Sequence, residues 1–160
     1  MLLLFHFYGI PQEKDQNLIE TTCKNTPNYQ LCISTLRAHP GSINTDIEGL
    51  GLIMVYAVKA KAIETSNAIK KLKGSQPELR NALNDCSGRY NAILEADVPE
   101  AVEALIKGDP KFAEDGMADA SLEAVSCEKS FKQVISPLTV LNNAVRDLSD
   151  VARAIIRNLL

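Results

Sequence analysis

Apolar residues recur every three or four positions along most of the chain, which is the spacing of one face of an α-helix. The first long run begins near Asn44 or Thr45, which we expect to cap a helix that continues to Gly74. Its apolar stripe contains Ile47, Met54, Val58, Ala62, Ile69 and Leu72. No stretch favours a strand, so the pattern predicts an all-α protein.

A second long helix starts at Ser75-Gln76-Pro77-Glu78. Because a proline inside a helix removes a backbone donor, Pro99 predicts a kink or a restart near Asp97, with residues 101–107 as the closing turns. The stripe of this helix contains Leu79, Leu83, Cys86, Tyr90 and Ile93.

Two further helices follow the helix-stopping sequence Gly108-Asp109-Pro110. The stripe of the third helix contains Ala113, Met117, Ala120, Ala124, Cys127, Phe131 and Val134. The fourth helix is expected to be capped by Ser136, with Pro137 in its first turn. Its stripe contains Leu138, Leu141, Val145, Leu148, Ala152, Ile155 and Leu159.

Each of the four helices carries one apolar stripe that it cannot bury alone. The connections between them are short and rich in glycine and proline, so we predict an up-down-up-down four-helix bundle. The stripes are also compatible with a coiled coil between separate chains, but the short connections favour closure within one chain.

Four cysteines refine this picture. Nine residues of continuous helix would hold the Cα atoms of Cys23 and Cys32 about 13 Å apart, and a disulfide tolerates about 7 Å. The turn residues 25–28 let the chain reverse, so this pair predicts a short helical hairpin. Cys86 and Cys127 lie at comparable distances on either side of Gly108-Asp109-Pro110, and both point inward.

Two disulfides therefore fit the predicted topology, and they imply an oxidising compartment. The alternative is four free buried thiols in a cytosolic bundle. The cysteine spacings lack the pattern of a zinc site, and we expect no metal.

The length of 160 residues and the hydrophobic content of 46% suit a single domain with an ordinary core. We assign residues 17–160 to this domain, with the helical hairpin at 17–42 and the bundle at 43–160. Residues 1–16 are interpreted as a leader remnant or a disordered tail, because they are apolar up to Tyr8 apart from His6.

The charges argue against two classes of partner. The 17 basic and 20 acidic residues give a net charge of −3 and are scattered along the chain, so nucleic acid is not expected. The apolar N-terminal run is too short to span a bilayer, so no membrane partner is expected either.

Enzyme signatures are sparse. His6 and His39 are the chain's histidines, and neither is placed as a general base or a ligand. No cofactor-binding motif is present, since Gly49-Leu50-Gly51 lacks the third glycine of a dinucleotide loop. Pairs of acids on helical spacing beside lysines are interpreted as solvated surface; they are Glu100/Glu103 and Glu114/Asp115. A carrier of a small apolar ligand is a further alternative.

The segment Asp109-Pro110-Lys111-Phe112 has two interpretations. If Ala113 and Met117 face the core, Lys111 and Phe112 face outward. The segment is then either an ordinary helix start, with Phe112 folded over the helix end, or a protruding contact site for a partner.

Several of these motifs together resemble the plant invertase and pectin methylesterase inhibitor family, and most closely its invertase-inhibitor branch. The resemblance spans residues 17–160. It rests on the cysteine frame and on three sequences, which are Thr22-Cys23-Lys24-Asn25-Thr26-Pro27-Asn28-Tyr29-Gln30-Leu31-Cys32, Gly108-Asp109-Pro110-Lys111-Phe112-Ala113-Glu114-Asp115-Gly116 and Leu148-Ser149-Asp150-Val151.

The resemblance implies a secreted bundle without catalytic activity, with disulfides Cys23–Cys32 and Cys86–Cys127. It implies a partner, an acid invertase, whose active-site cleft receives Pro110, Lys111 and Phe112 beside Asp109, so that inhibition is competitive. We expect a monomer in a 1:1 complex, in the cell wall or alternatively in the vacuole. Inhibition of pectin methylesterase on the same scaffold is the alternative function.

Overall fold

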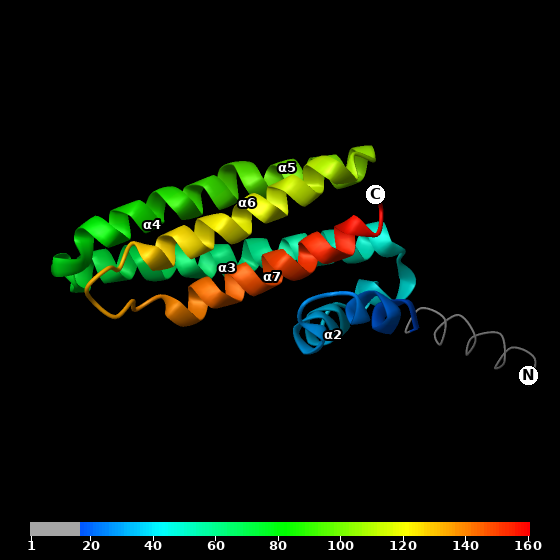
Figure 1. Ribbon diagram of the computed structural model, residues 1–160, viewed down its shortest axis with the longest axis horizontal. Coiled ribbons are helices and arrows are strands. Elements are labelled where there is room, and N and C mark those ends of the chain that lie inside the picture. The colour runs from blue at the N-terminus through cyan, green and yellow to red at the C-terminus, as the bar shows by residue number, and fades with distance from the viewer. Residues whose placement is uncertain (1–16) are drawn as a thin grey trace, which may run out of the picture.

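Four long helical rods lie side by side in the computed structural model, which describes residues 17–160 (Figure 1). A π-helical turn joins α4 to α5, so these two helices form one rod. Among the described residues there is no strand, and the all-α bundle is confirmed. The helices of the rods are α3 (Ile47–Ser75), α4 (Arg80–Ala92), α5 (Val98–Lys107), α6 (Pro110–Lys129) and α7 (Thr139–Arg157).

Consecutive rods run in opposite directions and close into a ring (Figure 1). α6 packs against α7 on one side and against α4 and α5 on the other, and α3 completes the ring by packing against α7 and against α4 and α5. This up-down-up-down arrangement buries the stripe of every rod, as the periodicity predicts.

The N-terminal extension is a helical hairpin, as predicted. A helix over residues 17–24 is followed by α2 (Tyr29–Arg37), and the Cys23–Cys32 disulfide joins them with a Cα–Cα distance of 5.5 Å. Asn28 caps α2 by accepting a hydrogen bond from the Leu31 amide at 3.1 Å. The hairpin packs against α3 and α7. The assignments made for residues 1–16, His6 included, lie outside the described residues.

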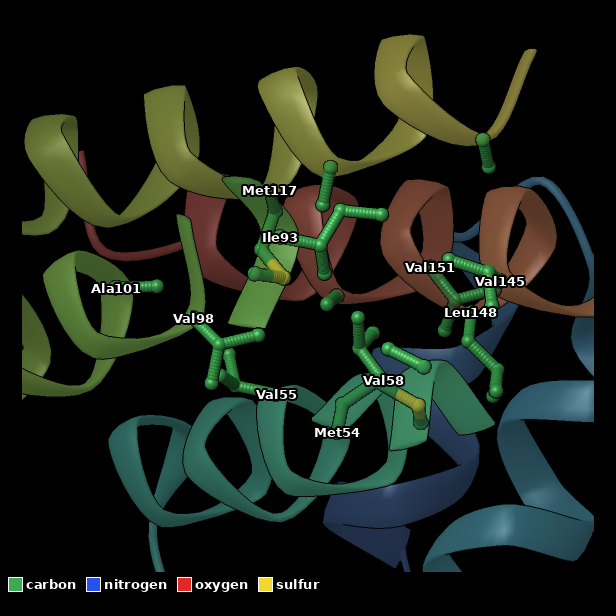
Figure 2. Packing of buried hydrophobic residues seen from close by; sticks show 14 of the residues in the cluster. Met54, Val55, Val58, Ile93, Val98, Ala101, Met117, Val145, Leu148 and Val151 are labelled. Carbon is green, nitrogen blue, oxygen red and sulfur yellow. The ribbon is translucent and has the colours of Figure 1, made fainter. Parts of the chain in front are cut away.

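The core sits where the four stripes meet. Figure 2 shows Met54 and Val58 of α3 and Met117 of α6 among the side chains that fill the space between the rods. All three side chains are fully buried. Burying a side chain of this size contributes about 1.5–3 kcal/mol, so the continuous core supplies the main drive for folding. The other labelled core residues are Val55, Ile93, Val98, Ala101, Val145, Leu148 and Val151.

The boundaries of three helices differ from those predicted. Asp46, and not Asn44 or Thr45, caps α3 by accepting a hydrogen bond from the Gly49 amide at 2.9 Å. Asn44 and Thr45 belong instead to a 3₁₀ turn, Pro40–Asn44, and the extended residue after it.

The stripe of α6 also ends earlier than predicted. The helix stops at Lys129, because the Ser130 hydroxyl turns back to bond the Ser126 carbonyl and the Asp85 carboxylate. Val134 lies beyond this point with 52% of its surface exposed, so its assignment to the core was wrong. Ser136 caps a turn by bonding the Leu138 amide at 3.0 Å, and α7 itself begins slightly later, at Thr139.

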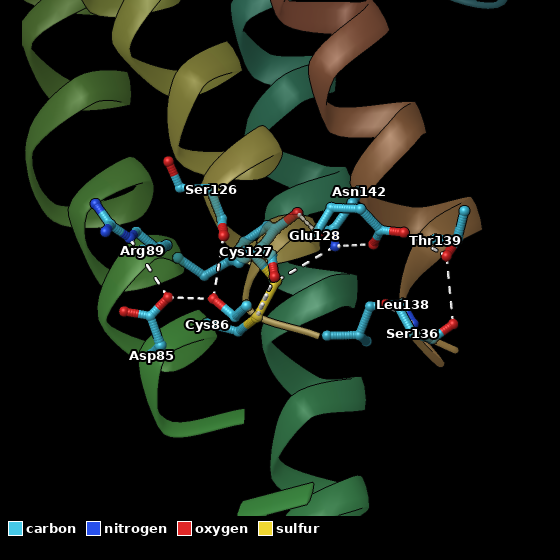
Figure 3. The surroundings of a disulfide bond; sticks show 12 residues. Asp85, Cys86, Arg89, Ser126, Cys127, Glu128, Ser136, Leu138, Thr139 and Asn142 are labelled. Atoms are coloured by element: carbon cyan, nitrogen blue, oxygen red, sulfur yellow. Dashed lines mark hydrogen bonds and ion pairs between the residues drawn. A yellow bond between two sulfur atoms is a disulfide. The ribbon is translucent and has the colours of Figure 1, made fainter. Parts of the chain in front are cut away.

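The Cys86–Cys127 disulfide links α4 to α6, with a Cα–Cα distance of 4.6 Å (Figure 3). Beside it, the buried Tyr90 hydroxyl donates to the Asn142 side chain at 2.7 Å, and the Asn142 amide donates to Glu128 at 2.8 Å. Burial raises the pKa of Tyr90 well above its ordinary value, so the phenol stays a neutral donor. This end of the bundle is held by a covalent bond and a satisfied polar network.

Glu128 of this network lies where burial and hydrogen bonding oppose each other. Burial disfavours its charged form, but hydrogen bonds from Thr139, Asn142 and Ser136 outweigh burial and lower its pKa. The carboxylate therefore remains ionised and keeps α6 tied to the start of α7.

The π-helical turn Ile93–Asp97 precedes Pro99, near the predicted position of the kink. It brings the Asp97 backbone close to α6 at Gly116, where an added Cβ would lie 2.8 Å from the Asp97 carbonyl oxygen. The Asp97 side chain is 7% exposed, and its Oδ2 atom has no hydrogen-bond partner among the described residues. Burial, followed by repulsion from Asp119, Glu123 and Glu100, raises its pKa to about 7.

Asp97 should make the protein more stable in acid. Its pKa is raised from 3.8 to about 7 in the folded chain, so its contribution is full below pH 3.8 and is lost as the pH rises towards 7. We expect Asp97→Asn to be about 1–2 kcal/mol more stable than the parent above that range and nearly equal to it in acid.

Thermal unfolding of parent and variant across this pH range measures the difference directly. A parent-to-variant difference that does not change with pH would show that Asp97 is ordinarily ionised in the folded protein.

The close approach at Gly116 should reject any side chain. Gly116→Ala should destabilise the protein by about 1–3 kcal/mol, because its Cβ would press on backbone that cannot move aside freely. Gly88 of α4 is the matched control, since an added Cβ there meets nothing within 4 Å. Gly88→Ala should therefore stabilise the helix by about 0.5–1 kcal/mol in denaturant titrations. Equal effects at the two glycines would contradict the packing described here.

Candidate functional site

The turn between α5 and α6 lies at one end of the bundle, the same end as the C-terminus (Figure 1). α5 ends at Lys107 and is capped by Gly108, whose φ of 82° lies in the left-handed region that glycine adopts without strain. The Asp109 amide bonds back to the Ala104 carbonyl at 2.8 Å, and Pro110 opens α6 with a φ suited to a first helical turn. We call residues 109–112 the tip.

The tip presents a cation and an aromatic ring to solvent. Phe112 is 57% exposed, and the Lys111 side chain is 66% exposed. The next residue, Ala113, is fully buried, so the helical register places the two tip side chains outward, as predicted. Phe112 is not folded into the core, and the ring is available to another molecule.

The Lys111 ammonium is paired with two carboxylates of α6. Its Nζ atom donates to Glu114 Oε1 at 2.8 Å and lies 3.3 Å from Asp115 Oδ1. The hydrogen bond to Glu114, followed by that to Asp115, raises the pKa of Lys111, so the ammonium stays charged across the physiological range.

The interpretation of Glu114 as a solvated surface acid was wrong. Its side chain is 6% exposed, and Arg157 at the end of α7 places Nε 3.0 Å from Oε2. Its neighbour Asp115, at 50% exposure, does match the solvated interpretation. The bond from Lys111 lowers the pKa of Glu114, with burial opposing and Arg157 and Arg153 assisting, so the carboxylate is ionised.

Two shallow pockets flank this end of the bundle. One, of about 190 Å³, lies behind the tip and is lined by Glu48, Leu105, Gly108, Pro110 and Leu159. The other, of about 260 Å³, lies between α7 and the hairpin loop and is lined by Pro27, Asp150, Arg153, Ala154 and Arg157. The tip therefore lies on a surface of α5, α6 and α7 that also contains these two pockets.

The remaining sequence candidates have structural roles. His39 Nδ1 accepts a hydrogen bond from the Gly41 amide at 3.1 Å, which caps a 3₁₀ turn. Glu103 is exposed and pairs with Lys107 one turn later. Within residues 17–160, no three His, Cys, Asp or Glu side chains gather in a way that would hold a metal ion.

The helices were also compared with the requirements of a membrane span. None of those in the described part of the chain combines the length and the hydropathy needed to cross a bilayer.

Comparisons with known proteins agree with the sequence motifs and the fold. The family model described as plant invertase/pectin methylesterase inhibitor matches residues 17–155. The chain is 48% identical over 139 residues to the "Cell wall / vacuolar inhibitor of fructosidase 1" of Arabidopsis thaliana, covering 87% of this chain and 67% of that protein. It is 30% identical over 154 residues to a "Putative invertase inhibitor" of Platanus acerifolia, covering 89% and 86%.

The fold has a counterpart among solved structures. A mutant form of a pectin methylesterase inhibitor from Arabidopsis superposes with a TM-score of 0.74 at 22% identity, covering 87% of this chain and 95% of that one. At this identity the likeness concerns the fold alone.

A side chain as exposed as Phe112 should contribute little to folding. Phe112→Ala is expected to change the free energy of unfolding by no more than about 0.5 kcal/mol, because the ring already lies in solvent. Met117→Ala, five residues further along α6 and fully buried, should lose about 2–5 kcal/mol. Chemical denaturation of both variants tests the contrast, and a large loss for Phe112→Ala would mean that the ring belongs to the core.

Proposed function

The chain belongs to the plant invertase/pectin methylesterase inhibitor family, and from that premise we propose that it inhibits an acid invertase (β-fructofuranosidase). It acts as an inhibitor without catalytic activity of its own. The relative that is 48% identical is named as an inhibitor of fructosidase, and this name supports the choice of target. The observation that carries the proposal is the outward position of Lys111 and Phe112 at the end of a covalently braced bundle.

In this proposal the tip enters the sucrose-binding cleft of the enzyme. A glycoside hydrolase of this kind uses a carboxylate nucleophile and a carboxylic acid around the sugar. The ammonium of Lys111 pairs with the carboxylates, and the ring of Phe112 packs against the apolar wall of the cleft. Substrate and tip then compete for one space, so inhibition is competitive.

The conformation of the tip in the free protein supports this role. Pro110 fixes one backbone angle, and the Asp109 amide is already bonded to the end of α5. Asp109 lies at the edge of the contact. Little backbone has to be ordered on binding, which favours affinity for a given contact area.

The complex should depend on pH. Lys111 keeps its charge in acid, whereas the carboxylates of the enzyme begin to protonate there. The attraction between them weakens when those carboxylates become neutral, so the lower pH limit of the complex is set by the enzyme.

We further propose that the protein works in the secretory pathway, in the cell wall or the vacuole, as a monomer in a 1:1 complex. The two disulfides support an oxidising compartment, because cytosolic thiols are kept reduced. The name of the 48% identical relative includes both cell wall and vacuole. Cell-wall location is the version that we favour.

Inhibition of pectin methylesterase is the second candidate. The solved structure of an inhibitor of that enzyme shares the fold, which supports it. In that case the outward faces of the helices, and not the tip, make the contact. Titrating the purified protein against a cell-wall invertase, a vacuolar invertase and a pectin methylesterase in parallel separates the candidates, and inhibition of the esterase alone would overturn the invertase proposal.

Lys111→Ala should weaken inhibition of invertase by at least about 30-fold, because a charge partner would be lost inside a desolvated contact. Lys61→Ala is the matched control, since Lys61 bonds Glu64 three residues later on α3 at 2.8 Å, the same arrangement as Lys111 with Glu114. The control should inhibit like the parent. The inhibition constants of the three proteins give the answer, and equal potency of Lys111→Ala and parent would rule out the proposed contact.

A further inference from the structure

In the free protein, the Lys111 ammonium that would bind the partner is already paired with a carboxylate of its own chain, that of Glu114. Glu114 is 6% exposed and is bonded to Lys111 on one side and paired with Arg157 on the other. A partner carboxylate must draw Lys111 away from this position. If Lys111 were the sole partner of Glu114, its departure would leave a buried anion uncompensated, which is strongly unfavourable.

We propose that Arg157 is a positioning residue for the tip, which holds the charge of Glu114 so that the Lys111 ammonium can turn to a carboxylate of the partner. This inference rests on the proposed function and names a residue of α7 that acts through Glu114.

The geometry around Glu114 fits such an exchange. Lys111 bonds Oε1, whereas Arg157 Nε lies 3.0 Å from Oε2 in an ion pair that lacks the alignment of a hydrogen bond. The guanidinium can therefore improve its contact when Lys111 leaves, because its fork of donors matches both oxygens of a carboxylate. Arg153, one turn earlier on α7, adds a second positive charge near Glu114.

The free protein also restrains Lys111 before the exchange. With Glu114 at 2.8 Å and Asp115 at 3.3 Å, the exposed side chain is paired with two carboxylates near the base of the tip. Holding a flexible side chain near its working position reduces the ordering that binding requires. Glu114 and Arg157 together thus keep the ammonium close to the contact and release it there.

A double-mutant cycle tests the inference. In the parent background, Arg157→Gln should weaken inhibition of invertase by about tenfold, because Glu114 then competes with the partner for Lys111. In the Glu114→Gln background, where there is no charge to hold, the same change at Arg157 should have almost no effect. Arg157→Lys, which keeps the charge, should retain most of the inhibition.

Arg146→Gln is the matched control, because Arg146 forms an ion pair with Asp147 near the middle of the same helix, three turns from Arg157. It should leave inhibition unchanged. Thermal unfolding of every variant checks that loss of inhibition is not loss of fold.

The outcomes separate the inference from the function on which it rests. A parent protein without activity against invertase overturns both. A parent that inhibits, with Arg157→Gln equally harmful in the two backgrounds, overturns the inference alone and shows that Arg157 touches the enzyme directly. An Arg157→Gln variant as potent as the parent also overturns the inference.

Discussion

The antiparallel pairing of the α4–α5 rod with α6 is the constraint on which the rest of the structure depends. At one end the Cys86–Cys127 disulfide joins the two rods across 41 residues of chain. Closing a loop of that length in the unfolded chain is worth about 4 kcal/mol in the entropic account. At the other end the turn at Gly108 reverses the chain directly into Pro110. Because the hairpin is fixed at both ends, the tip is attached to a rigid support.

The middle of this hairpin contains a close backbone contact and a buried acid. The π-helical turn accommodates Pro99 and brings backbone against Gly116 at a distance that no side chain tolerates. The same turn buries Asp97 near three other acids. An anion here is unfavourable, and protonation of the Asp97 carboxyl relieves that cost.

The sequence was sufficient for the bundle, because apolar spacing reports which face of each helix is buried. The sequence was insufficient where a contact between helices determines whether a residue is buried or where a helix begins and ends. Glu114 stands beside Asp115 and three residues after Lys111, a spacing typical of a solvated face, yet it is buried and pairs with Arg157. A partner from α7 has no signal in the local sequence. Val134 continued the spacing of α6 past the point where Ser130 ends the helix. The start of α3 offers three consecutive residues of types that cap helices well, which are Asn44, Thr45 and Asp46. The local sequence does not distinguish them, and in the fold Asp46 is the cap.

The separation between the exposed Phe112 and the buried Ala113 has an evolutionary consequence. One side chain meets the interior and the next meets water, so packing constrains the first position much more than the second. Mutations of Phe112 can therefore be tried by selection at little cost in folding, whereas Lys111 is tied to the buried Glu114. A bundle of this kind is a suitable ancestor for inhibitors that diverge in target while retaining their architecture.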